Sequence, residues 1–235
     1  MAIGDLKDCL PAGAEAAREA PGLDLEEIIE RYKAEPYESF PMVAPHTGQV
    51  SFIVSEGDRV EAPSGNWRER PGSLLYTLLR QANRKKIFAP TNGTVSDLQA
   101  ALQGSFVAAG TYLMTIKHPM TRQEVIQRVL REVLYVFRAP EKARYLFVPE
   151  LAAKMEKKKS KVLVRQGEEI LIMSRMKRDT PVIYDGQSGI IYTNYLRPNV
   201  SVEAGEPLLG ICPPGRLDYV CRLVQRINLE WEAPE

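Results

Sequence analysis

The sequence has 235 residues, of which 44% are hydrophobic and 26% are charged, and its formal net charge at pH 7 is +1. This composition is typical of a soluble globular protein with one or two domains. The near-neutral charge argues against nucleic acid or an anionic membrane as a partner.

The sequence offers few groups for metal or redox chemistry. No apolar run is long enough to cross a bilayer and the charged N-terminus is unlike a signal peptide, so we expect a cytoplasmic protein without a membrane partner. Cys9, Cys212 and Cys221 form no C-x-x-C pair, which favours free thiols. His46 and His118 each stand beside a proline, and we interpret both as ordinary turn residues. We therefore predict no metal site and no catalytic residue.

We expect residues 1–39 to form an N-terminal tail and a short helix. The tail covers 1–22, and the capping pattern of Asp24 and Glu27 begins the helix, which Pro36 ends. Residues 40–118 then alternate short β-branched or apolar runs with Gly, Pro, Asn and Asp, which is typical of an all-β module. We expect its strands at 49–54, 74–79, 86–88, 94–98 and 112–116. Residues 61–72, which include Trp67, are interpreted as an inserted loop.

Residues 119–143 are predicted to form a connecting helix between two modules. Thr121 and Glu124 supply a second capping box, and apolar residues keep helical spacing from Val125 to Phe137. The prediction ends this helix at Ala139 and Pro140.

A second β-rich module is expected over 144–215, and a C-terminal helix, or alternatively a strand, over 216–235. The expected elements are a short helix over 149–159 and strands at 144–148, 161–165, 170–174, 182–184, 190–195 and 208–211. The basic run from Lys154 to Lys161 is interpreted as a solvated face, with a surface for phosphate or an acidic partner as the alternative. The run from Asp185 to Gly189 is a turn rather than a phosphate loop, because a strand follows it.

Internal repeats are the most informative feature of the sequence. Ala44-Pro45-x-x-Gly48-x-Val50 recurs as Ala89-Pro90-x-x-Gly93-x-Val95. A second pattern crosses the modules, because the spacing of Val107, Gly110, Leu113 and Ile116 recurs at Val202, Gly205, Leu208 and Ile211. Glycine between apolar runs allows the chain to reverse direction, and the apolar residues fill a narrow interior.

These repeats resemble the biotinyl/lipoyl-carrier family of barrel-sandwich domains. The resemblance rests on Gly57-Asp58-Arg59-Val60 and the two Ala-Pro motifs in the first module. In the second it rests on 167–173, Ser188-Gly189-Ile190 and 205–211. The implied fold is mainly β with connecting helices, in tandem barrel-sandwich hybrid modules. The family's first Ala-Pro segment in the second module is taken to be replaced by Val148-Pro149 and a short helix.

Family members carry their cofactor on a lysine at the tip of a hairpin. In the first module Ala82 takes that position, so the resemblance implies a degenerate module. In the second module Lys177 takes it and Met176 precedes it, as in the biotin motif, although Arg175 and Arg178 depart from the family pattern. Lys177 is therefore the candidate attachment residue for biotin, with lipoate as a second choice.

Two functions follow from this resemblance. The first is a biotin-carrier-like protein that presents Lys177 to a biotin ligase and to biotin-dependent carboxylase or carboxyltransferase subunits, with catalysis left to those partners. The alternative is an unmodified adaptor that uses the biotinyl/lipoyl-like fold as a scaffold and carries no cofactor.

Overall fold

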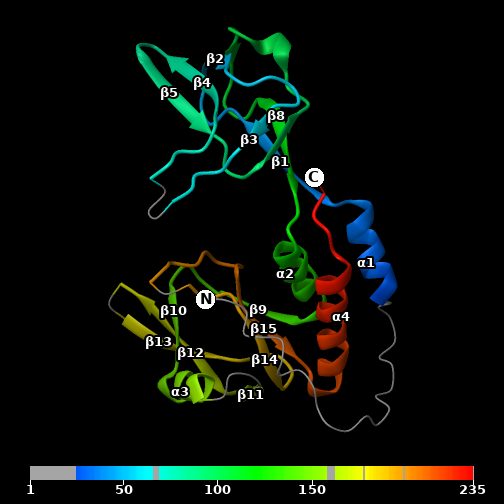
Figure 1. Cartoon of the computed structure of the whole chain (residues 1–235). Coiled ribbons are helices and arrows are strands. Elements are labelled where there is room, and N and C mark those ends of the chain that lie inside the picture. Colours follow the sequence, from blue (N-terminus) through cyan, green and yellow to red (C-terminus); the bar gives the residue numbers. More distant parts are fainter. Residues whose placement is uncertain (1–24, 66–68, 158–161, 177, 198, 235) are drawn as a thin grey trace. The chain divides into compact units, whose positions relative to one another are not determined.

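The computed structural model describes residues 25–65, 69–157, 162–176, 178–197 and 199–234. The fold is mainly β, with small antiparallel sheets and four α-helices in the described residues (Figure 1). The first helix, α1, spans Leu25–Ala34. Contacts divide the described residues into a first β unit, Glu30–Thr121 with 232–234, and a second β unit, Arg122–Trp231 with 25–29. None of the helices in the described ranges combines the length and apolarity needed to cross a bilayer.

The first β unit consists of two four-stranded sheets. One has the strand order β1-β8-β6-β3 and the other β5-β4-β2-β7, and all pairs are antiparallel. The strands are β1 (Tyr37–Val43), β2 (Gly48–Phe52), β3 (Arg59–Val60), β4 (Leu74–Arg80), β5 (Asn83–Phe88), β6 (Gly93–Ser96), β7 (Phe106–Val107) and β8 (Tyr112–Pro119).

The repeated motif occupies equivalent places in the two halves of this unit. Val50 and Val95, one from each copy, are both buried in the core. The backbone hydrogen bonds are reciprocal as well, because the N–H of Gly57 donates to the Val95 carbonyl and the N–H of Gly104 donates to the Val50 carbonyl, both at 2.9 Å. The repeat in the sequence therefore corresponds to a repeat in the structure.

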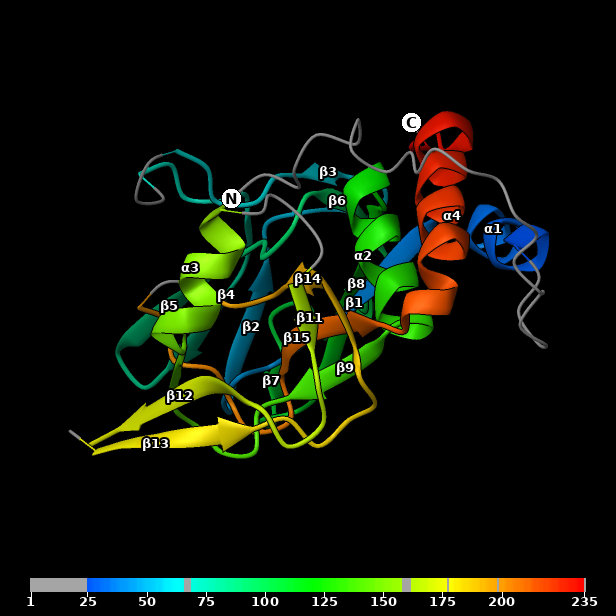
Figure 2. The same cartoon turned by 90° about the horizontal axis from the view of Figure 1, so that it is seen from below.

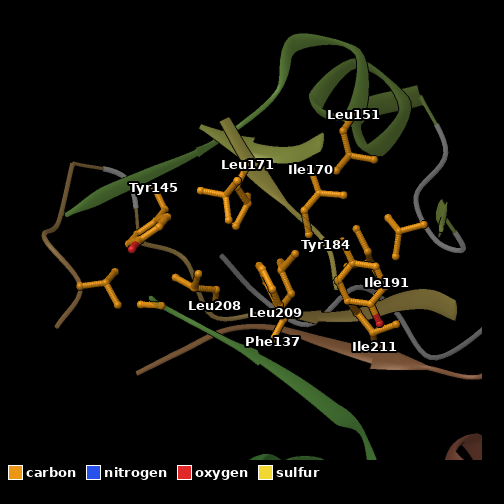
Figure 3. Packing of buried hydrophobic residues seen from close by; sticks show 14 of the residues in the cluster. Phe137, Tyr145, Leu151, Ile170, Leu171, Tyr184, Ile191, Leu208, Leu209 and Ile211 are labelled. Carbon is orange, nitrogen blue, oxygen red and sulfur yellow. The ribbon is translucent and has the colours of Figure 1, made fainter. Parts of the chain in front are cut away.

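The second β unit contains a three-stranded and a four-stranded antiparallel sheet, with strand orders β10-β12-β13 and β11-β14-β15-β9. Its elements are α2 (Arg122–Val133), β9 (Tyr135–Arg138), β10 (Arg144–Phe147), α3 (Pro149–Lys157), β11 (Val162–Val164), β12 (Glu169–Arg175), β13 (Arg178–Ile183), β14 (Gly189–Asn194), β15 (Pro207–Cys212) and α4 (Leu217–Glu230). Figure 3 shows Ile170, Leu171 and Tyr184 pointing into the same core as Leu208 and Leu209.

The connecting helix predicted over 119–143 is wrong beyond Val133. Residues Tyr135–Arg138 form β9, which pairs with β15. Val133 and Phe137 are four residues apart, so both fit a helical face, but the run between them is also aromatic and β-branched, which suits a strand. The sequence prediction also missed β1, β3 and β7, of which β1 begins inside the segment assigned to the N-terminal tail and helix.

In the second unit, Ala139-Pro140 takes the place of the first Ala-Pro segment. The prediction that Val148-Pro149 replaces this segment was therefore wrong. Ala139 exchanges backbone hydrogen bonds with Gly205 and Glu206 as Ala44 does with Gly110 and Thr111. The backbone pairing of the motif therefore recurs here, with Ala143 at the place of Gly48 and buried Tyr145 at that of Val50, although only Ala-Pro is kept in sequence. Val148-Pro149 instead begins α3.

Candidate functional site

The hairpin formed by β12 and β13 is the candidate site. The two strands run side by side in Figure 2 and stay in register up to the pair of Arg175 and Arg178. Met176 follows Arg175 with a φ of 48°, and its side chain is 87% exposed. Lys177, the predicted attachment residue, lies outside the described residues. The neighbouring residues therefore place the end of this hairpin between Arg175 and Arg178.

The first β unit contains a hairpin of the same construction. β4 and β5 pair up to Arg80 and Asn83, again with two residues between the paired positions. Gln81 has a φ of 53°, so it matches Met176 in both position and backbone conformation. Positive φ at the first central residue is what a tight two-residue hairpin turn requires. By this register, Ala82 is the counterpart of the position that the sequence assigns to Lys177.

Buried residues at the base of the hairpin fix its direction. Ile170 and Leu171 of β12 have no exposed surface, and Tyr184, which follows β13, is equally buried (Figure 3). The hydroxyl of Tyr184 donates a hydrogen bond of 2.7 Å to the Gln187 carbonyl, and burial is the main cause that raises its pKa to about 12. Exposure then increases along the strands, so that Arg175 and Arg178 are exposed. The hairpin is therefore anchored at one end and open to solvent at the other.

A loop that the sequence analysis overlooked lies against the hairpin end. Arg175 forms an ion pair of 2.5 Å with Glu141, and the hydroxyl of buried Tyr145 donates a hydrogen bond of 2.6 Å to the Glu141 carbonyl. Burial of the Tyr145 ring is the main cause that raises its pKa. Both charged side chains are more than half exposed, so the ion pair stabilises the fold by at most about 1 kcal/mol. The spacing Ala139-Pro140-x-x-Ala143 was the signal that would have identified this loop.

The sequence prediction treats both histidines as turn residues, but only one of them lies in a turn or bend. His118 belongs to β8 rather than to a turn, so that part of the prediction was wrong. It is buried, its Nδ1 lies 2.6 Å from the Asn92 carbonyl oxygen, and its ring contacts Phe40 edge-on. His46 lies in the bend between β1 and β2. In the described residues no three His, Cys, Asp or Glu side chains converge on a point that could hold a metal ion.

Among the described residues, the others singled out by sequence do not join the hairpin site. Cys212 and Cys221 are buried, and burial raises the pKa of Cys212 to about 11. Cys9, Trp67 and Lys158 to Lys161 lie outside the described residues. Lys154 is exposed on α3.

A shallow pocket of about 290 Å³ in the second β unit lies beside the turn that begins at Asp185. The Tyr135 hydroxyl donates a hydrogen bond of 3.3 Å to the Asp185 carboxylate there. Partial burial and the Asp185 charge raise the pKa of Tyr135. The predicted turn is present and a strand, β14, follows it.

Comparisons with known proteins add little to this geometry. No family model matches the chain, and no curated protein matches it. Among the solved structures that match, one is described as a single-chain, multi-domain long-chain acyl-CoA carboxylase and aligns at 17% identity with a TM-score of 0.28. The alignment covers 62% of this chain and 14% of that one. A TM-score this low supports no inference about fold or function.

Proposed function

We propose that this chain is a biotin-carrier-like protein built from two barrel-sandwich modules of the biotinyl/lipoyl type, of which only the second carries a cofactor. Support for the modules comes from the paired sheets and reciprocal backbone hydrogen bonds of the first unit, and from the third copy of the Ala-Pro motif at Ala139. The proposal depends mainly on the register that the two hairpins share. In this register the sequence position of Lys177 is equivalent to that of Ala82.

Biotin fits this position as a tethered group rather than as a bound ligand. The hairpin end is exposed at Arg175, Met176 and Arg178. A group attached there would be free to reach a partner active site, where its effective concentration is set by the tether. Lipoate would be attached in the same way and remains the second choice.

Attachment requires a ligase and an activated cofactor. The Nζ of Lys177 would attack the carboxyl carbon of biotinyl adenylate. An amide bond then forms, the bond to AMP breaks, and Nζ releases its proton to water. The carboxylation chemistry itself belongs to partner carboxylase or carboxyltransferase subunits.

The experiment is an avidin blot of the protein purified from its own host under biotin-replete conditions. Wild type is expected to react, while Lys177→Arg, which keeps the positive charge, is expected not to react. Lys154→Arg is the matched control and should react like wild type, since Lys154 lies on α3. An unreactive wild type, or a reactive Lys177→Arg protein, contradicts the proposal.

A second candidate function is that of an unmodified adaptor. Arg175 and Arg178 favour it, because a basic hairpin end differs from the surface that biotin ligases read in the family. In that case neither biotin nor lipoate is present on the host protein, and intact mass equals the mass of the unmodified chain.

A further inference from the structure

All the charged residues on the strands of the sheet β5-β4-β2-β7, in the first unit, are basic. Its strands carry Arg80, Arg84, Lys85 and Lys86 and no Asp or Glu. All four side chains are exposed, and none of them forms an ion pair with any described residue. Three of the four lie on one strand, β5, so the positive charge is concentrated at one edge of the sheet.

That edge also has backbone groups available for pairing. β5 is the outermost strand of its sheet, and among the described residues it pairs only with β4 (Figure 1). A two-residue turn makes the flanking pair, Arg80 and Asn83, a hydrogen-bonded pair, and such pairs alternate along an antiparallel ladder. The N–H and C=O groups of Arg84 and Lys86 therefore point away from β4.

We propose that the free edge of β5 is a docking site for an extended acidic segment of a partner protein, which adds to the sheet as a fifth strand. Strand addition uses the outward backbone groups of Arg84 and Lys86. Acidic residues at alternate positions of the incoming strand would face Arg84 and Lys86 on one side of the sheet, with Lys85 on the other side. This proposal goes beyond the carrier function and does not depend on modification of Lys177.

The geometry favours a peptide over a nucleic acid. Outward N–H and C=O groups at a strand edge match a peptide backbone, whereas single-stranded nucleic acid is held by aromatic stacking platforms. β5 has one aromatic residue, Phe88, at its far end. Lysine on an edge strand also prevents edge-to-edge aggregation, since two basic edges repel each other. The same charge that excludes a second copy selects an acidic strand.

The second unit provides an internal contrast. Counted from the hairpin end, Pro181 of β13 corresponds to Lys86 of β5, because Pro181 pairs with Ile172 as Lys86 pairs with Thr77. Proline has no N–H to donate, and it is tolerated in an edge strand where that N–H would face solvent. The free edge of β13 is therefore blocked at the position where the edge of β5 is open.

This contrast supplies the test on the full chain. A fluorescein-labelled dodecapeptide of alternating Glu and Thr is titrated with protein, and fluorescence anisotropy gives the affinity. The controls are a Lys-Thr dodecapeptide and a twelve-residue oligothymidylate. Lys86→Pro removes one outward N–H, Lys86→Gln removes the same charge but keeps the N–H, and Arg144→Glu reverses an exposed charge of the second unit. Hydrogen exchange of wild type with and without the Glu-Thr peptide reports on the individual amides.

We expect wild type and Arg144→Glu to bind the Glu-Thr peptide alike, Lys86→Gln to bind a few-fold more weakly, and Lys86→Pro to lose at least about tenfold in affinity. Exchange of the Arg84 and Lys86 amides should slow when the peptide binds wild type. The proposal is overturned if wild type does not bind this peptide or if oligothymidylate binds as tightly. Equal affinities of the two Lys86 variants, together with unchanged exchange at Arg84 and Lys86, would overturn it as well.

Discussion

Gly93 of the repeated motif and Gly189 of the second unit both lie against the backbone of neighbouring strands. A Cβ at Gly93 would overlap the Lys117 carbonyl oxygen and come within 2.8 Å of Ile116 Cγ2. A Cβ at Gly189, in the second unit, would lie 2.8 Å from the Cys212 carbonyl oxygen. Glycine is required at these positions because the strands approach too closely for a side chain. Close packing therefore explains these glycines, and no chemical role is needed for them.

Gly93→Ala is therefore expected to lower the free energy of unfolding by about 1–3 kcal/mol, since backbone must move to admit the methyl group. Gly215→Ala is the matched control, because a Cβ there meets nothing within 4 Å. Urea denaturation monitored by circular dichroism checks both variants. Equal stability of the two would show that the close approach at Gly93 is absent.

Buried tyrosine hydroxyls make stability depend on alkaline pH. Burial raises the pKa of Tyr76 and of Tyr184 from 10.0 to about 12. The folded state then keeps a proton that the unfolded state loses above pH 10, so this contribution is present below pH 10 and is lost as pH rises to 12. Tyr184→Phe should flatten the decrease in unfolding free energy between pH 10 and 12, as measured by urea denaturation. An unchanged slope contradicts the assignment.

At the scale of elements, the hairpins depend on residues in an unfavourable backbone conformation. Gln81 and Met176 both have positive φ, which costs about 1 kcal/mol for a residue with a side chain. Each is tolerated because paired strands enforce the turn on either side. The two hairpins thus share a conformational requirement although their sequences differ.

Gln81→Gly is expected to raise the free energy of unfolding by about 0.5–1 kcal/mol by relieving this cost. Ala82→Gly is the control and should lower it by a similar amount, because Ala82 has no positive φ and glycine only adds freedom to the unfolded chain. Thermal denaturation of both variants decides the matter. A destabilised Gln81→Gly protein would count against the turn geometry.

Much of the element order could be predicted from sequence, and the failures have identifiable causes. The repeats at Ala44 and Ala89 were recognisable because glycine and valine recur at fixed spacing. The copy at Ala139 was missed because Ala143 and Tyr145 replace those residues, and because Val133 and Phe137 fit a helix as well as a strand. The hairpin position was predictable by counting from glycine, but the Glu141–Arg175 ion pair joins residues far apart in sequence and required coordinates.

At the scale of the whole molecule, the two β units have separate hydrophobic cores. Leu75, Leu78 and Leu113 belong to the core of the first unit, and Ile170 and Leu208 belong to that of the second. A core that is contiguous within one unit is the usual basis of cooperative unfolding. We therefore expect a substitution in one core to destabilise the unit that contains it and to leave the other unit unchanged.

Ile170→Ala should cost about 2–5 kcal/mol, because the side chain has no exposed surface. Hydrogen exchange followed by mass spectrometry is expected to show faster exchange in β9 to β15 and unchanged exchange in β1 to β8. Leu75→Ala is the reciprocal variant, with the opposite pattern. Equal acceleration in both units would show that the cores unfold as one.

We propose a modifiable lysine in the second unit at the position where the first unit has Ala82. The most direct measurement is the intact mass of the full chain from its own host, followed by fragmentation of the peptide that contains Lys177. A biotin carrier is expected to show a mass increase of one biotinyl group, located on Lys177. A mass equal to that of the unmodified chain, or a biotinyl group on another lysine, would contradict it.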